Sequence, residues 1–348
     1  MKDRVWIWKE LGWNWKELKR DSKDNPWIYI GLIVVLLVVC VSSTLASENA
    51  RSKVTLEEVL SVGSLDDDTL FQWVGVTVDS YGQIYVTDAM DYSLKKFDAD
   101  GKLLQKAGGK GQGPGEFLAP RLLVCSDDHL FVTDQSLPGI QVFDHNLKFV
   151  HRIPIKIPIG DVQVISDDRI AIVALLINQS GSIHVYDHGG QLLKQIHYTE
   201  GKKSSMMDWV EIDFDSEDNL YLVYNFQDRI EKFDVNGGRL WSRSLLGIKK
   251  IKTKKVGPWE VPDKIVFKDI VFDSEDRMYI LGGGHSANPS RDVYVLNPDG
   301  KLLTTFTLPE SSHCIYIDSN NFLYSRANDG ITLKKYRIQW PISSQPAM

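Results

Sequence analysis

The sequence predicts an all-β protein whose main part is a six-bladed β-propeller, preceded by one transmembrane helix and a short amphipathic cytoplasmic helix. Three observations lead to this prediction. A strand–turn–strand phrase recurs six times along the chain. Each copy occupies about 40–45 residues, the length of four antiparallel strands in one propeller blade. Near the N-terminus, 20 successive residues carry no charge, which is the length of one bilayer-spanning helix.

Residues 1–26 form a Trp-rich arm that contains two similar heptapeptides, WIWKELG and WNWKELK. Seven residues make nearly two helical turns, so Trp6 lies on the same face as Trp13. The same holds for Trp8 and Trp15. An amphipathic helix at the membrane surface fits this pattern, because tryptophan favours the headgroup region. The alternative is a docking helix for a protein partner in the membrane, since tryptophans dominate binding hot spots.

Residues 27–46 are the uncharged segment, which we expect to be a retained transmembrane helix. A cleaved signal peptide is the rival interpretation, but a charged region of 26 residues before the apolar run is unusually long for a signal. Seven Lys and Arg residues precede the segment and two follow it within residues 47–60. The positive-inside rule therefore puts the N-terminus in the cytoplasm and the large domain on the periplasmic or other extracytoplasmic side of the inner membrane.

After a linker at 47–52, residues 53–340 contain the repeats. Each unit reads as four strands joined by turns that are rich in Asp, Asn and Gly, which supply the positive φ of tight hairpins. Equivalent positions at the end of the third strands are Phe97, Phe143, Tyr186, Phe233, Leu296 and Tyr336.

The sixth unit ends after its third strand, and an incomplete blade would leave an exposed sheet edge. The strand-like segment from Lys53 to Gly63 belongs to no unit of its own. We therefore predict that it pairs outside the last strand and closes the ring, which leaves residues 341–348 as a C-terminal tail. Were this segment to lie elsewhere, the assignment of the two faces of the ring would be lost.

Composition and short motifs exclude several classes of function. The net charge of −6 gives no indication of nucleic-acid binding, and three cysteines make neither a disulfide framework nor a zinc site. No CxxC, HExxH or GxSxG motif is present. The glycine-rich stretch Ala107–Phe117 lacks the Gly-Lys-Ser/Thr of a phosphate loop, so it is expected to link the first blade to the second.

The chain resembles the NHL-repeat and related six-bladed propellers over about residues 53–340. The resemblance lies in the blade phrase GVTVDSYGQIYVTDAMDYSLKKFDADGKLL and in the Gly-Pro-Gly segment GGKGQGPGEFLAP. It implies the propeller architecture and says less about activity. Some relatives are lyases or lactone hydrolases with a metal over the central channel, whereas most of those characterised bind proteins or ligands without chemistry.

Candidate residues at the channel mouth are His285, His313 and Arg326, but the motif context of the metal-dependent relatives is missing. The Asp-rich hairpins recur in most blades, so they are interpreted as turn formers and not as metal ligands. We therefore predict no catalytic residue, no metal and no cofactor.

The link Gly247–Lys264 is longer than its counterparts and holds a run of lysines. A solvated loop is one interpretation; a docking surface for an acidic protein partner is the other. The residues assigned to this surface are Lys249, Lys250, Lys252, Lys254, Lys255 and Trp259. Because the linker 47–52 is short, the opposite face of the ring should lie near the membrane, and the lysines should point away from it.

The leading hypothesis for function is a single-pass membrane protein whose propeller acts as a non-catalytic protein-binding or assembly subunit of a membrane complex. The alternative is a metal-dependent lyase or hydrolase with its site over the channel. A soluble exported form, released by cleavage, is a third possibility.

Overall fold

The computed structural model describes residues 54–341, apart from 65, 67–68, 176–178, 200–204, 258, 286–287 and 328. The compact unit discussed below runs from Val54 to Gln339. The Trp-rich arm, the uncharged segment 27–46 and the tail 342–348 lie outside the described residues. Within the described residues, no helix is both long enough and apolar enough to cross a membrane.

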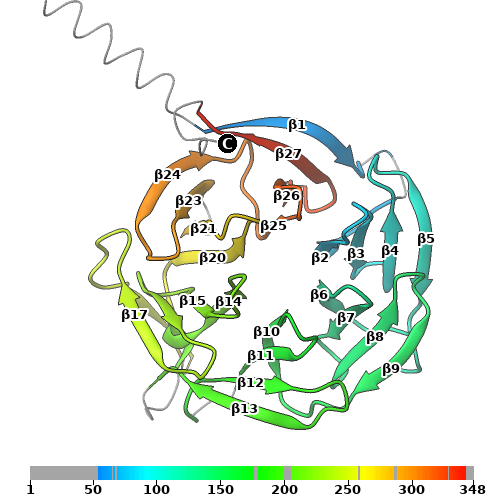
Figure 1. Ribbon diagram of the computed structural model, residues 1–348, viewed down its shortest axis with the longest axis horizontal. Helices are drawn as coiled ribbons and strands as arrows, with labels where there is room; N and C mark the ends of the chain where they lie inside the picture. Colours follow the sequence, from blue (N-terminus) through cyan, green and yellow to red (C-terminus); the bar gives the residue numbers. More distant parts are fainter. Residues whose placement is uncertain are drawn as a thin grey trace, which may run out of the picture. The chain divides into compact units, whose positions relative to one another are not determined.

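The described residues form six antiparallel sheets arranged in a ring around a central axis, as predicted (Figure 1). In each sheet four strands follow one another from the centre to the rim. Blade 1 consists of β2 (Trp73–Val78), β3 (Ile84–Asp88), β4 (Ser93–Phe97) and β5 (Leu103–Gly108). Blade 2 consists of β6 (Pro120–Cys125), β7 (His129–Asp134), β8 (Ile140–Asp144) and β9 (Phe149–Ile153). Blade 3 consists of β10 (Ile159–Val164), β11 (Ile170–Ala174), β12 (Ser182–Tyr186) and β13 (Leu192–His197).

The remaining blades carry two additions to the four-stranded plan. Blade 4 consists of β14 (Val210–Phe214), β15 (Leu220–Tyr224), β16 (Ile230–Phe233) and β17 (Arg239–Arg243), and the short 3-10 helix η1 (Met206–Asp208) precedes it. Blade 5 consists of β20 (Ile265–Phe272), β21 (Met278–His285), β23 (Asp292–Leu296) and β24 (Leu302–Thr307), with β22 (Asn288–Pro289) paired to β21. Between them, β18 (Thr253–Val256) and β19 (Trp259–Pro262) form a separate hairpin.

Blade 6 is completed by the N-terminal strand, so the predicted closure is confirmed. β25 (Ile315–Ile317), β26 (Phe322–Arg326) and β27 (Leu333–Gln339) supply three strands, and β1 (Thr55–Val62) pairs antiparallel along the outside of β27. The register runs from Thr55 opposite Gln339 to Val62 opposite Leu333. β1 and β27 lie side by side at the rim of the ring (Figure 1).

The hydrophobic core lies between neighbouring blades. The alternation of apolar residues in each strand gives both faces of a sheet side chains that pack against the next sheet. One cluster, for example, joins Val62 of blade 6 to Val76 and Phe97 of blade 1. The six third-strand residues that the repeats identified are all buried. The ring is therefore held by side-chain packing at each junction and by one shared sheet at its closure.

Two faces of the ring can be distinguished by their turns. We call the face with the turns between first and second strands and between third and fourth strands the basal face. The opposite face, with the links between blades, is called the top face. Because β27 runs from top to base and β1 is antiparallel to it, Thr55 lies at the basal face. The β18–β19 hairpin belongs to a link between blades, and so to the top face.

Candidate functional site: the central channel

A cavity of about 570 Å³ occupies the centre of the ring. All six first strands contribute to its wall. Side chains alternate along a strand, so two positions of each first strand face the channel. Counted back from the last residue of the strand, they are the third residue before it and the residue directly before it. The first of these positions is occupied by Gly75, Leu122, Asp161, Glu211, Asp269 and Cys314, and the second by Thr77, Val124, Gln163, Asp213, Val271 and Tyr316.

Acidic residues gather in three successive blades. Asp161, Glu211 and Asp269 occupy equivalent positions in blades 3, 4 and 5, and Asp213 lies one layer deeper. Burial raises the pKa of Asp161 to about 6 and that of Asp213 to about 7. Burial and the charge of Asp161 raise the pKa of Glu211 well above its usual value. The pKa of Asp269 is also raised well above normal, chiefly by burial.

Three of these carboxylates join neighbouring blades. Asp161 accepts hydrogen bonds from the backbone N–H of Val162 in its own strand and of Ile212 in the next blade, both at 2.8 Å. Asp213 accepts hydrogen bonds in the same way from the backbone N–H of Phe214 in its own strand and of Phe272 in blade 5, at 2.8 and 3.1 Å.

Asp269 likewise accepts hydrogen bonds from the backbone N–H of Ile270 in its own strand and of Ile315 in blade 6, at 3.0 and 2.8 Å. Glu211 accepts a hydrogen bond from the Asn225 side chain at 3.1 Å and shares a second with the Asp161 carboxyl group. The channel acids therefore have bonding partners in the protein, which gives them a structural role.

Basic groups surround the mouth of the channel at the top face. Arg121, Lys268 and His313 each directly precede the first channel-facing position of their strand, and Arg326 ends β26. Lys268 donates a hydrogen bond from Nζ to the Ser312 carbonyl at 2.7 Å. Burial lowers the pKa of Lys268. Burial, and then the charges of Arg326 and Lys268, lower the pKa of His313.

The structure separates the three channel-mouth candidates. His313 and Arg326 line the cavity. His285 does not line it, because β21 continues to pair with β22 and carries His285 to an exposed position, where Nδ1 lies 3.1 Å from the Asp263 carbonyl oxygen. Among the described residues, no group of three or more His, Cys, Asp or Glu side chains is arranged to hold a metal ion.

The lysine-rich link lies beside a second hollow, of about 800 Å³, next to blade 4. Lys249 and Lys250 line it, together with Arg229, Arg243 and apolar residues. Lys254 and Lys255 belong to β18, whose four residues are all exposed, and Lys252 is exposed as well. Trp259 begins β19, and its side chain is outside the described set. Trp6, Trp8, Trp13 and Trp15 also lie outside the described residues.

Sequence reasoning missed Arg121, Lys268 and the acidic layer. The acids could have been found by aligning the ends of the first strands, since Asp161, Glu211 and Asp269 then fall in one column. The basic residues are harder to find. A register shift lies between Pro120 and Leu123 and another between Phe267 and Asp269, so a simple count of alternate residues does not place Arg121 or Lys268 in the channel.

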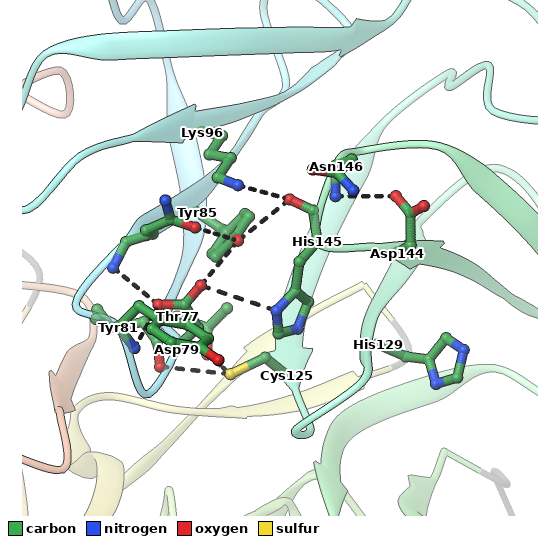
Figure 2. A network of polar contacts seen from close by, with 12 residues as sticks. Thr77, Asp79, Tyr81, Tyr85, Lys96, Cys125, His129, Asp144, His145 and Asn146 are labelled. Atoms are coloured by element: carbon green, nitrogen blue, oxygen red, sulfur yellow. Dashed lines mark hydrogen bonds and ion pairs between the residues drawn. The ribbon is translucent and has the colours of Figure 1, made fainter.

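At the basal face the Asp-rich hairpins are turn formers, as predicted, and they also bind a buried tyrosine. In blade 1, Asp79 accepts backbone hydrogen bonds from Tyr81 and Gln83, and its second oxygen accepts one from the Tyr85 hydroxyl at 3.0 Å. Figure 2 shows this cluster, with Lys96 directed to the His145 carbonyl of blade 2. The same Asp–Tyr pair occurs in blades 4, 5 and 6 as Asp215–Tyr221, Asp273–Tyr279 and Asp318–Tyr324.

The geometry places the chain in the class of six-bladed β-propellers, and the comparisons with known proteins agree. A family model described as a 6-bladed beta-propeller matches residues 49–122. A search of curated proteins finds no significant match to the chain.

Solved structures share the architecture at low sequence identity. A member of the DUF4221 family from Bacteroides vulgatus is 10% identical, with a TM-score of 0.60 over 83% of this chain and 99% of the other. A protein of unknown function from Bacteroides thetaiotaomicron is 12% identical, with a TM-score of 0.57 over 83% and 76%. A catalytically inactive virginiamycin B lyase from Staphylococcus aureus with quinupristin is 13% identical, with a TM-score of 0.52 over 84% and 90%. At this identity the likeness concerns the fold alone.

Proposed function

We propose that this chain is a single-pass protein of the inner membrane whose extracytoplasmic propeller is a non-catalytic protein-binding or assembly subunit of a membrane complex. The observation that carries the proposal is the β18–β19 hairpin, an exposed addition to the six blades that bears lysines. A ring built only to close on itself does not require this element. Conspicuous additions to a rigid scaffold are where binding functions are commonly found.

The chemistry of this surface suits an acidic partner. Lys249 and Lys250 line the second hollow, and Phe226, Ile248 and Ile251 give it apolar walls. Positive charge on a chain of net charge −6 would steer an acidic protein to this side of the ring, and apolar walls would hold an anchoring side chain.

The position of Thr55 in the ring supports a role for the lysines away from the lipid. Thr55 lies at the basal face, and the seven residues from 47 to 53 span at most about 25 Å. A helix at 27–46 would thus keep the basal face near the bilayer. The lysine-bearing hairpin belongs to the top face, where a partner in the same complex could reach it.

The basal rim also carries a ring of exposed aliphatic side chains. In blades 1 to 5 a β-bulge follows the basal turn, and in blade 6 a bulge lies at the equivalent place within the β1–β27 ladder; each leaves one residue of the outer strand unpaired. These residues are 39–53% exposed: Val59, Leu104, Val150, Leu193, Leu240 and Leu303. Their recurrence on one rim suits a surface close to the membrane interface, where apolar side chains are tolerated better than in water.

The test compares two charge-reversed variants of the full chain in native membranes. The first variant changes Lys249, Lys250, Lys254 and Lys255 to Glu. The control changes Lys102, Lys148 and Lys301 to Glu, all exposed near the basal turns. After mild detergent extraction, a protein that co-purifies with the wild type and the control, and is lost from the first variant, supports the proposal. A wild-type chain that migrates alone would contradict it. Alkaline extraction of the membranes tests the anchor separately.

The enzyme alternative rests on His313 and Arg326 at the channel mouth. Three of the four channel carboxylates, Asp161, Asp213 and Asp269, are bound to backbone N–H groups of the neighbouring blades. Metal analysis of the purified chain separates the two hypotheses, since a tightly held stoichiometric zinc or calcium would favour a lyase or hydrolase.

A further inference from the structure

The basic residues at the channel mouth come from widely separated parts of the chain but meet at one level of the ring. Arg121 belongs to β6 of blade 2, Lys268 to β20 of blade 5, and Arg326 to β26 of blade 6. Blades 2 and 5 lie across the ring from one another (Figure 1). The mouth therefore has a guanidinium on one side, and an ammonium and a second guanidinium on the other.

Three of the four acidic groups below the mouth are already engaged by backbone N–H groups of the ring. Asp161, Asp213 and Asp269 each use both oxygens for backbone N–H groups. Arg121 acts on Asp161 and Glu211 through charge alone. Burial also raises the pKa of these acids, so the acidic layer carries less negative charge near neutral pH than its composition suggests.

The mouth consequently presents half-buried cations to a cavity of about 570 Å³, a size that accommodates a small organic molecule. Arg121, Lys268 and Arg326 are all half-buried, and His313 beside them is exposed. Like charges gathered in a partly dry site favour the binding of an opposite charge. Guanidinium groups form strong, charge-assisted hydrogen bonds with carboxylate and phosphate oxygens.

We propose that the channel mouth binds a small organic anion, whose carboxylate or phosphate oxygens are held between Arg121 on one side and Lys268 and Arg326 on the other. This goes beyond the proposed assembly role and makes the propeller a ligand-binding subunit. The expected ligand is an anion and not a divalent cation, because the carboxylates that a cation would need are used to join the blades.

The experiment measures binding to the purified full-length chain in detergent by isothermal titration calorimetry, in buffer without other multivalent ions. Citrate serves as the carboxylate probe and pyrophosphate as the phosphate probe. The variants Arg121→Gln and Lys268→Met remove one cation from each side of the mouth, and Lys301→Gln at the basal face is the matched control. The urea midpoint of each unliganded variant establishes that it is folded.

Saturable binding of citrate, of pyrophosphate or of both supports the proposal, and the preferred probe identifies the anionic group. Arg121→Gln and Lys268→Met should each raise the Kd at least about tenfold, as expected for loss of a charge-assisted hydrogen bond. Lys301→Gln should bind like the wild type. The proposal is overturned if neither probe binds, or if folded Arg121→Gln and Lys268→Met keep the wild-type Kd. It is also overturned if calcium or zinc binds in the channel in place of the anions. The anion titrations do not bear on the partner test with the lysine hairpin, so the two proposals can fail separately, and only a metal in the channel would count against both.

Discussion

Asp215 illustrates how one residue both shapes a turn and satisfies a buried hydroxyl. Its carboxylate accepts hydrogen bonds from the backbone N–H of Asn219 and from the Tyr221 hydroxyl, at 2.9 and 3.0 Å, and Lys232 lies 3.1 Å away. Lys232 stands directly opposite Tyr221 in the strand register. Although burial opposes it, hydrogen bonding from Asn219 and Lys232 lowers the pKa of Asp215.

The carboxylate, the tyrosine and the cation of this cluster tend to be present together in a blade or absent together. Lys96 and Lys335 occupy the position of Lys232 in blades 1 and 6. Blade 5 has Val295 there, and Arg277 instead reaches Asp273 at 2.6 Å. Blades 2 and 3 lack all three groups: the acid is replaced by Ser126 and Ile165, the tyrosine by Phe131 and Ala171, and the cation by Val142 and Val185. A buried hydroxyl without an acceptor is costly, which explains why the acid and the tyrosine disappear together.

The Asp–Tyr pair should therefore show strong energetic coupling. We expect Tyr221→Phe to lower the free energy of unfolding by roughly 1–2 kcal/mol, because Asp215 loses one of its buried donors. Asp215→Asn should cost more, and the double variant should cost less than the sum of the two. Urea unfolding of the four proteins gives the coupling energy. Additive effects would show that the hydroxyl and the carboxylate do not interact.

The channel acids predict a specific dependence of stability on pH. Burial raises the pKa of Asp213 to about 7, above the value near 3.9 of an unfolded chain. Protonation therefore stabilises the folded state; this stabilisation is complete below the unfolded pKa and is lost as the pH rises through 7. Between pH 5 and pH 8 the wild type should lose roughly 2 kcal/mol through Asp213.

Asp213→Asn removes this titration, so its free energy of unfolding should fall less over the same pH range. Urea midpoints at pH 5, 6, 7 and 8 provide the measurement. Asp100→Asn, at an exposed basal turn, is the control and should follow the wild type. Identical pH profiles for Asp213→Asn and the wild type would mean that Asp213 does not titrate in this range.

At the scale of elements, the strand β1 contributes one residue to the hydrophobic core and another, three positions earlier, to the surface. Val62 is 4% exposed and packs with Val76 and Phe97 of blade 1. Val59 is the bulged, exposed residue of the same strand. We expect Val62→Ala to lower the free energy of unfolding by about 2 kcal/mol, and Val59→Ala to change it by less than about 0.5 kcal/mol. Equal effects in urea unfolding would contradict the described register of β1.

Elements that follow strict alternation could be predicted from the sequence, and those that break it could not. The blade strands alternate or are apolar throughout between turn residues, and the structure confirms them together with the six third-strand residues and the closing strand β1. Arg121 and Lys268 lie within register shifts, where strict alternation fails, so they were not expected in the channel. The β18–β19 hairpin was also missed, because its lysines give no apolar signal.

At the scale of the whole molecule, the shared blade explains how the ring stays closed. A covalent link joins each blade to the next, and the only break in the ring lies within blade 6, where β1 and β27 are held by a strand ladder from Thr55–Gln339 to Val62–Leu333. Breaking that ladder requires the loss of several backbone hydrogen bonds, each worth about 1 kcal/mol. The location of the chain ends within a blade should therefore determine how often the ring opens.

Two circular permutants of residues 54–339 test this idea, each with a short linker between Gln339 and Val54. One has its new ends at Gly237–Gly238, between β16 and β17 of blade 4, and the other at Gly111–Gly113, in the link between blades 1 and 2. The first keeps a backbone strand ladder across its break, whereas the second has side-chain packing and a few side-chain hydrogen bonds there, such as that of Lys96 to the His145 carbonyl. Amide hydrogen exchange in β2 and β6 should be at least about tenfold faster in the second permutant, because the gap can open without breaking a sheet. Both permutants should give the same circular dichroism spectrum, since they share every non-covalent contact. Equal exchange rates would mean that packing between blades, and not the shared sheet, keeps the ring closed.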